Sequence, residues 1–516
     1  FLRTSAVCSS SENHKILVEK TAQGIQYSIN IIISFAMTIE SIDVVVEGLQ
    51  MTMMRANSDS RKITTIEDLK NALSRKDQST LHLVLGQESN LKALTEAIRT
   101  VGSTSSNTIQ QLKIEVEQDH GVNDEEKFLP CVSEPDWETE VAVELFEALG
   151  SLDDIKVIHL ESLGTTLGAE GPRFPLELLS LLLDNPNRRE ILEGLHLKSC
   201  SFSCFEDETA MEFGEAIQNL TDLQSIDWEE RLFEEDAEFF TAQTFYFPSV
   251  TNAIFGLPSL RWLGIRAVGA GKNGIMGLLE DDTLGALCQS QNLERLCLLN
   301  FEYTETSIAA MSEALKEPSC KINTLRLDLS FSLASDGLVF CQSLPINQSI
   351  KTLELWISYS NNWNKERCLY ELADALKENN TLSIVRLHSH DQSLQDSEDT
   401  DNKEKKFGDD KAEAFVRMLE SNVRITSLGL DDYNLYFTDD QGTYAPLIEF
   451  YTDLNTLGRN EIMTKHESLS IDAWMCLLNK TTNRLQAKAD LYAVEAMYFW
   501  LRQNPAICDV YRYTAS

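Results

Sequence analysis

The chain has 516 residues and a mass of 58.2 kDa, which is more than one compact domain usually contains. Its composition, 43% hydrophobic and 24% charged, is typical of a chain with a large core and excludes collagen-like and low-complexity classes. The 44 basic and 81 acidic residues give a formal net charge of −37, which repels phosphate backbones and anionic membranes. We therefore expect neither nucleic acid nor anionic lipid as a partner.

Residues 1–62 contain one apolar run, from Ile29 to Met37, which includes Asn30 and Ser34. This run is too short to cross a bilayer, because a spanning helix needs about 20 apolar residues. We therefore expect no membrane insertion. Residues 1–62 are interpreted as an N-terminal segment that is either a degenerate first repeat or a cap.

From residue 63 to residue 440 the chain repeats an apolar triplet at positions 1, 4 and 6 of a short segment. The copies that start at residues 192 to 382 follow one another at intervals of between 28 residues (322 to 350) and 37 residues (223 to 260), which is a repeat period. The pattern predicts strands with positions 4 and 6 buried and positions 3, 5 and 7 on the opposite face. The copies are Leu81/Leu83, Ile109/Leu112/Ile114, Ile155/Ile158/Leu160, Leu192/Leu195/Leu197, Leu223/Ile226/Trp228, Leu260/Leu263/Ile265, Leu293/Leu296/Leu298, Ile322/Leu325/Leu327, Ile350/Leu353/Leu355, Leu382/Val385/Leu387 and Ile425/Leu428/Leu430.

Amphipathic segments lie between the triplets, with apolar residues three and four positions apart. Their spacing predicts helices over 307–316, 366–378 and 410–420. Each helix must cover its apolar stripe against another element. We therefore expect a parallel sheet of triplet strands with helices on one face.

One copy, Leu192 to Phe202, has the sequence LEGLHLKSCSF and reads L-x-x-L-x-L-x-x-C-x-F. It resembles the leucine-rich repeat signature, with Cys200 at the Asn/Cys position, and the long period resembles the ribonuclease-inhibitor-like subclass. The resemblance implies an α/β solenoid, or horseshoe, of about 11 units, with a parallel sheet on the concave side and helices on the convex side. Four copies have other residues at the Asn/Cys position: Phe301, Ser330, Ser358 and Tyr433.

Three connections in this array, residues 118–137, 229–258 and 388–410, are too long for a plain unit and are interpreted as insertions. The third is rich in charge and nearly free of apolar residues, so we expect an exposed loop, with a regulated docking element as the alternative.

Two further helices are predicted after the array, over 467–479 and 484–502. They indicate a helical C-terminal cap in 441–516, because the end of an array exposes an apolar edge. Within this region LNTLGR, Trp474 and LRQNPAIC are similar to the tails of uncharacterised leucine-rich repeat proteins of unicellular algae.

The eleven cysteines are an odd number without paired spacings, which predicts reduced thiols and an intracellular, cytoplasmic location. The close pair Cys200 and Cys204 lacks a second pair with zinc-ligand spacing, so no metal site is expected. Four N-x-S/T sequons occur at about the frequency that chance provides. They are at Asn219, Asn347, Asn379 and Asn479.

No phosphate-binding, zinc-protease or nucleophile-elbow motif occurs in a suitable context. The glycine-rich stretch from Gly264 to Gly277, GIRAVGAGKNGIMG, matches neither phosphate-binding spacing. We therefore expect no cofactor and no catalytic activity, so the chain is not predicted to be an enzyme.

The predicted strands place Arg and Trp side chains on their outward face, where we expect them to point to solvent and to be dispensable for folding. Arg and Trp dominate interface energetics. Either this surface binds a partner with acidic and aromatic groups, or the Arg side chains pair with neighbouring strand carboxylates, for example Arg326 with Glu354, and serve only solubility. The candidate partner-binding residues are Trp262, Arg266, Arg295, Arg326, Trp356, Arg386 and His388. The carboxylates expected on the same face are Glu115, Glu161, Asp227, Glu229, Glu354 and Asp431.

These features predict a monomeric, non-catalytic scaffold that binds another protein on the concave face. The resemblance implies the same, since such arrays commonly serve as recognition scaffolds, although fold alone does not determine function. One alternative is an activator of a small GTPase, as some acidic proteins with this repeat type are. The other is an extracellular receptor-like recognition module.

Overall fold

The computed structural model describes residues 79–85, 91–102, 109–116, 137–164, 173–203, 207–231, 244–268, 277–279, 283–329, 334–357, 362–389, 409–429, 444–456 and 459. All of them belong to the unit Ile63–Ser516. The N-terminal segment 1–62 lies outside the described residues. So do Trp474 and residues 501–508, LRQNPAIC, which carry part of the resemblance noted for the C-terminal region.

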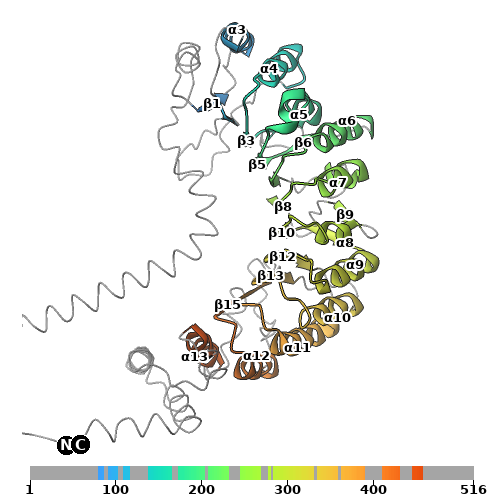
Figure 1. Cartoon of the computed structure of the whole chain (residues 1–516), viewed down its shortest axis with the longest axis vertical. Helices are drawn as coiled ribbons and strands as arrows, with labels where there is room; N and C mark the ends of the chain where they lie inside the picture. Colours follow the sequence, from blue (N-terminus) through green and yellow to red (C-terminus); the bar gives the residue numbers. More distant parts are fainter. Residues whose placement is uncertain are drawn as a thin grey trace, which may run out of the picture. The chain divides into compact units, whose positions relative to one another are not determined.

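An open, all-parallel sheet of eleven strands is the centre of the described structure (Figure 1). Neighbouring strands in the sheet follow one another in chain order, so each new strand is added at the same edge. The strands are β1 (Thr80–Leu85), β2 (Gln111–Val116), β3 (Val157–Glu161), β5 (Gly194–Cys200), β7 (Ser225–Arg231), β8 (Trp262–Val268), β10 (Arg295–Leu298), β12 (Thr324–Leu329), β13 (Thr352–Ile357), β14 (Ile384–Ser389) and β15 (Ser427–Gly429). Two short parallel pairs accompany them: β4 (Phe174–Pro175) with β6 (Phe202–Ser203), and β9 (Gly277–Leu279) with β11 (Phe301–Tyr303).

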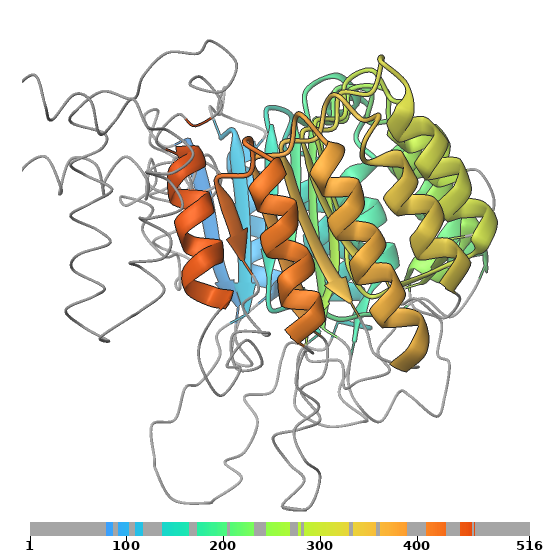
Figure 2. The same ribbon diagram turned by 90° about the horizontal axis from the view of Figure 1, so that it is seen from below.

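Eleven α-helices in the described ranges alternate with the strands and form a layer along one face of the sheet (Figure 2). This repeat-like α/β arrangement is compatible with a solenoid, and the helices predicted over 307–316, 366–378 and 410–420 are confirmed as α9, α11 and α12. The helices are α3 (Leu91–Gly102), α4 (Glu140–Gly150), α5 (Leu176–Leu183), α6 (Asp207–Gln218), α7 (Pro248–Phe255), α8 (Thr283–Cys288), α9 (Glu305–Lys316), α10 (Ala334–Ser343), α11 (Asn362–Glu378), α12 (Asp409–Ser421) and α13 (Tyr444–Thr456). None of them is long and apolar enough to cross a membrane.

Regular elements occupy the ends of two of the expected insertions. Strand β7 continues to Arg231 and α7 begins at Pro248, so both lie within 229–258. Likewise β14 includes His388 and α12 begins at Asp409. Residues 118–136, 232–243 and 390–408 lie outside the described residues, as do the two helices predicted at 467–479 and 484–502. Of the expected C-terminal cap, the structure describes α13, which packs on α12, and Arg459.

The apolar triplets fill the space between the sheet and the helices. In the six triplets that start at residues 192, 260, 293, 322, 350 and 382, no side chain is more than 1% exposed. Equivalent triplet residues are also neighbours across the sheet, as in the series Leu296, Leu325 and Leu353. Each strand therefore presents the same face to the helices as its neighbours do.

A chain of aromatic side chains extends this core across several units. The ring centroids of Phe174 and Phe202 are 6.0 Å apart, those of Phe202 and Trp228 are 5.0 Å apart, and Phe245 lies 5.0 Å from Trp228. Phe301, which stands at an expected Asn/Cys position, continues the series with its centroid 5.8 Å from that of Phe245. At this position a buried ring therefore replaces a side chain that would bond to the backbone.

Buried asparagines connect each of three turns to the helix of the preceding unit. The side-chain amide of Asn379 donates to the carbonyl oxygen of Leu344 at 2.6 Å, and its own oxygen accepts from the backbone N–H groups of Thr381 and Leu382 at 2.9 and 2.7 Å. Asn347 and Asn422 make equivalent bonds. A carbonyl at a helix end and two N–H groups before a strand are thereby satisfied by one side chain.

We predict that Asn379→Ala destabilises the chain by roughly 2 to 4 kcal/mol, because it leaves these buried backbone groups without partners. The side chain of Asn219 is exposed at the end of α6, so Asn219→Ala is the matched control and should change stability by less than about 0.5 kcal/mol. Urea unfolding followed by circular dichroism measures both. Equal losses for the two variants would contradict this role of Asn379.

A carboxyl group is buried on the core side of the sheet at Glu230 of β7, which is 2% exposed. Burial raises the pKa of Glu230 to about 7, although the Trp228 indole N–H, which donates to Glu230 at 3.2 Å, favours the charged form. Because the pKa is higher in the folded state than in the unfolded state, the folded chain binds the proton more tightly. The contribution of this group to stability is therefore most favourable below pH 4.5 and is lost as the pH rises through 7.

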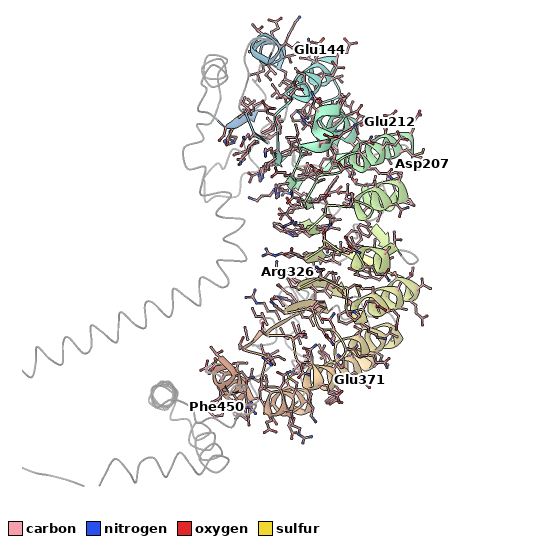
Figure 3. The ribbon with its side chains drawn as sticks, in the orientation of Figure 1. Glu144, Asp207, Glu212, Arg326, Glu371 and Phe450 are labelled. Atoms are coloured by element: carbon pink, nitrogen blue, oxygen red, sulfur yellow. The ribbon has the colours of Figure 1, made fainter. Side chains whose placement is uncertain are left out.

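We therefore expect Glu230→Gln to stabilise the chain at pH 8, by at most about 3 kcal/mol, and to have little effect at pH 5. Glu212 on the exposed side of α6 (Figure 3) provides the control, because Glu212→Gln removes a charge without changing a buried group. Thermal unfolding at the two pH values tests this. An unchanged pH dependence in Glu230→Gln would show that the buried carboxyl does not titrate in this range.

Candidate interaction surface

Side chains that alternate with the buried triplets lie on the sheet face opposite the helices. We call this surface the strand face and define it by the alternating residues from Thr80 of β1 to His388 of β14. All seven sequence-predicted candidates belong to it and are half-buried, since each alternates with core residues such as Leu263, Leu325 and Leu355. The register makes Trp262 a neighbour of Arg295, Glu354 a neighbour of both Arg326 and Arg386, and Trp356 a neighbour of His388.

Arg266 is held by two carboxylates of the preceding strand. Its Nη1 lies 3.2 Å from Oδ1 of Asp227, and its Nη2 lies 2.6 Å from Oε2 of Glu229. Burial disfavours the charged guanidinium, but the two carboxylates keep the pKa of Arg266 above its ordinary value. Arg266 is therefore a fixed cation and not a mobile surface side chain.

Arg326 and His388 share the carboxylate of Glu354, which is only 8% exposed. Nε2 of His388 donates to Oε1 of Glu354 at 2.9 Å, and Nε of Arg326 lies 2.9 Å from Oε2 without its N–H pointing at that oxygen. Burial alone would raise the pKa of Glu354; the hydrogen bond from His388 and the charge of Arg326 hold this pKa below its ordinary value. The predicted pairing of Arg326 with Glu354 is therefore confirmed.

Trp356 and Trp262 each contact a histidine of the same face. The ring of His388 stacks on Trp356 with centroids 4.3 Å apart and an interplanar angle of 14°, while His196 meets Trp262 at 6.4 Å in an edge-on arrangement. A Cβ atom at Gly264 would lie 3.3 Å from Nε1 of Trp262, so this glycine gives the indole its room. Gly264 thus serves packing on the strand face, and residues 269–276 of the glycine-rich stretch lie outside the described residues.

Arg295 differs from Arg266 and Arg326, because it forms no ion pair with any residue that the structure describes. It is half-buried next to Trp262 on one side and Thr324 on the other. Trp262 and Arg295 are therefore adjacent, partly exposed and not committed to a carboxylate in the described structure.

Histidines on the strand face are the feature that the sequence analysis missed. All four histidines in the described ranges lie on strands of this sheet, at His82, His159, His196 and His388, and only His388 was a candidate. The register pairs His159 with His196, their rings are 6.3 Å apart, and burial together with His159 lowers the pKa of His196 to about 4. The signal was present, because His82, His159 and His196 each occupy position 5 of a triplet segment.

Lysines and glutamates link the first strands of the same face. Nζ of Lys113 lies 2.7 Å from Glu161, and Nζ of Lys198 contacts the other oxygen of Glu161 at 2.8 Å. A hydrogen bond with His159 and these two ammonium groups hold the pKa of Glu161 well below its usual range. Ion pairs therefore connect neighbouring strands on this side as they do around Arg266. Of the expected carboxylates, Asp431 lies outside the described residues.

Metal ligation and thiol chemistry are two properties of the strand face that the described residues bear on. No group of three or more His, Cys, Asp or Glu side chains there is placed to hold a metal ion. Cys297 lies on this face between Gly264 and Arg326, but burial raises the pKa of its thiol to about 12, so the thiol stays protonated at neutral pH. Cys204, the possible partner of Cys200 in a metal site, lies outside the described residues.

The fold and this face define an α/β protein with an open parallel sheet, one side covered by helices and the other lined with paired charges and aromatic rings. Scanning the sequence against protein-family models finds no match, and a search of curated proteins finds none either. Among solved structures, the chain is similar to "Leiomodin-1 Actin-Binding Site 2 (ABS2)", with 15% identity and a TM-score of 0.23. That match covers 35% of this chain and 92% of the other.

The ion pair with Glu354 corrects the expectation that Arg326 is dispensable for folding. We predict that Arg326→Ala destabilises the chain by about 1 to 3 kcal/mol, because Glu354 is left buried with less compensation. Arg295→Ala removes the same kind of side chain without breaking an ion pair of the described structure, so it should stay within about 0.5 kcal/mol of the parent. Urea unfolding compares the two. A loss for Arg295→Ala as large as that for Arg326→Ala would contradict this assignment.

Proposed function

We propose that the chain is a non-catalytic binding scaffold, a ribonuclease-inhibitor-like leucine-rich repeat solenoid with a helical C-terminal cap, and that a protein partner binds on its concave strand face. The repeat period of the triplets, the in-register parallel strands and the helix layer on one side support this architecture. Solenoids of this kind present one continuous row of strand side chains, which suits the recognition of a large surface.

The neighbouring pair Trp262 and Arg295 is the observation that carries the proposal. Both residue types dominate the energetics of protein interfaces when they are partly exposed among well-packed neighbours. Around them, the ion pairs of Arg266 and Arg326 hold the remaining side chains in place. Binding to a surface that is already ordered costs less conformational entropy, so a partner keeps more of its contact energy.

The two alternatives stay predictions from the sequence, as do the monomeric state and the cytoplasmic location. For the receptor-like alternative, two of the four sequons are poor glycan acceptors: Asn347 and Asn379 are 2% and 1% exposed, and their amide nitrogens donate to backbone carbonyls. Asn219 is exposed, and Asn479 lies outside the described residues. The activator of a small GTPase has no specific observation on the strand face in its favour.

Capture of binding partners from extracts of the native organism tests the proposed function. The parent chain is compared with the double variant Trp262→Ala/Arg295→Ala and with Val143→Ala/Met211→Ala, which truncates two exposed apolar residues of the helix layer as a control. We expect the strand-face variant to bind the main captured protein at least tenfold more weakly, or about 1.4 kcal/mol. The helix-layer variant should bind it as the parent does.

Affinities are then measured by titration with the purified partner, after each variant has been shown to unfold at the temperature of the parent. If the partner binds Trp262→Ala/Arg295→Ala as tightly as the parent chain, the strand face is not the binding surface. Loss of binding in the control variant alone would place the site on the helix layer.

A further inference from the structure

We propose that the strand face selects an acidic protein segment, whose carboxylates contact the guanidinium groups of Arg295, Arg326 and Arg386 beside the ring of Trp356. This inference rests on the proposed function and names the chemistry of the partner. The net charge of −37 repels an acidic partner at long range. Attraction of such a partner therefore has to come from the local arrangement of charges on the strand face.

Charged groups on the strand face are arranged in two levels, with carboxylates below and cations above. The side chain of Arg326 is 33% exposed and that of Glu354 is 8% exposed. Arg266 is 31% exposed, whereas its partners Asp227 and Glu229 are 15% and 12% exposed. A group that approaches the sheet therefore meets guanidinium nitrogens first.

The same order holds at the other end of the face. Lys198 is 52% exposed and Lys113 is 29% exposed, while Glu161, which both contact, is 20% exposed. On the helix layer no such order holds. The carboxylate is the more exposed partner in the pair of Lys316 and Glu313, at 71% against 25%, whereas the guanidinium is the more exposed in the pair of Arg417 and Glu413, at 71% against 43%. Figure 3 shows Arg326 on the strand side, whereas the labelled Glu144, Asp207, Glu212 and Glu371 project from the helices.

The strand face from β10 to β14 carries more cationic than anionic side chains in the described strands. Three guanidinium groups, those of Arg295, Arg326 and Arg386, lie there with two carboxylates in the described strands, Asp328 and Glu354. Asp328 is 6% exposed and accepts from the backbone N–H of Asn300 at 3.3 Å, and Glu354 is shared between Arg326 and His388. Neither carboxylate is in a position to meet a basic partner.

Spacing along the face suits a short segment with several carboxylates. Arg326 lies one strand from Arg295, and Arg386 lies two strands beyond Arg326. Because neighbouring strands are about 4.8 Å apart, these steps correspond to about 5 and 10 Å across the sheet. Carboxylates three, four or seven positions apart on a helix lie about 5 to 10 Å from one another, which matches this spread. An apolar residue between them would contact Trp356, which lies between the strands of Arg326 and Arg386.

Three synthetic helical peptides of equal length and identical apolar residues test the inference with the full chain. They carry Glu, Gln or Lys at the same polar positions, and their binding is followed by fluorescence anisotropy. General electrostatics of the acidic chain favours the Lys peptide. We expect the Glu peptide to bind at least fivefold more tightly than the Gln peptide, and its affinity to fall as salt is raised from 50 to 500 mM.

A pair of charge-reversal variants locates the effect. Arg295→Glu and Lys316→Glu change the net charge by the same amount, but the first lies on the strand face and the second on the helix layer. We expect Arg295→Glu to weaken the Glu peptide at least tenfold and Lys316→Glu to change its affinity less than twofold. Thermal unfolding confirms that both variants remain folded.

The inference is overturned if the Glu peptide binds no better than the Gln peptide, or if the two charge-reversal variants weaken it equally. A native partner that is lost from Trp262→Ala/Arg295→Ala but is basic would leave the proposed function in place and overturn the acidic chemistry alone. A native partner that does not depend on Trp262 and Arg295 would instead remove the binding surface itself.

Discussion

In-register pairing of one parallel strand with the next is the constraint on which the rest of this structure depends. A strand of alternating side chains has only two faces, and a slip of one residue would exchange them. In this chain such a slip would place Leu325 or Leu353 in water and Arg326 or Glu354 in the core, at a cost of several kcal/mol per strand. The period of the apolar triplet therefore sets both the core and the composition of the opposite face.

Buried asparagines and aromatic rings in several units help to keep that register. The asparagines at 347, 379 and 422 satisfy a helix end and the start of a strand with one side chain, so the turn between them has little freedom. The aromatic series from Phe174 to Phe301 joins neighbouring units through ring contacts at the opposite end of the strands. Local bonds and packing thus agree with the global arrangement, as expected of a minimally frustrated repeat.

Register also explains the chemistry of the strand face. Residues far apart in the sequence, such as Arg326 and Glu354, become neighbours because each strand repeats the position of the last. Carboxylates such as Glu354 and Asp227 lie low on the sheet and are covered by longer cationic side chains, whose heads reach solvent. In these pairs the cationic side chain is therefore the more exposed partner, although the chain as a whole is strongly acidic.

The sequence by itself determined the strands, the buried triplets and the helices at α9, α11 and α12, because these follow from periodicity, which is a local property. It also placed the seven candidate residues on one face, since alternation in a strand leaves no other choice once Leu325 and Leu355 are buried. It offered the pairing of Arg326 with Glu354 only as an alternative, it did not distinguish Arg295 from Arg266, and it left His159 and His196 unnoticed. Only the tertiary structure decided which guanidinium meets a carboxylate and which side chain lies above its partner, because pairing and depth depend on residues about 30 positions apart being brought to adjacent strands.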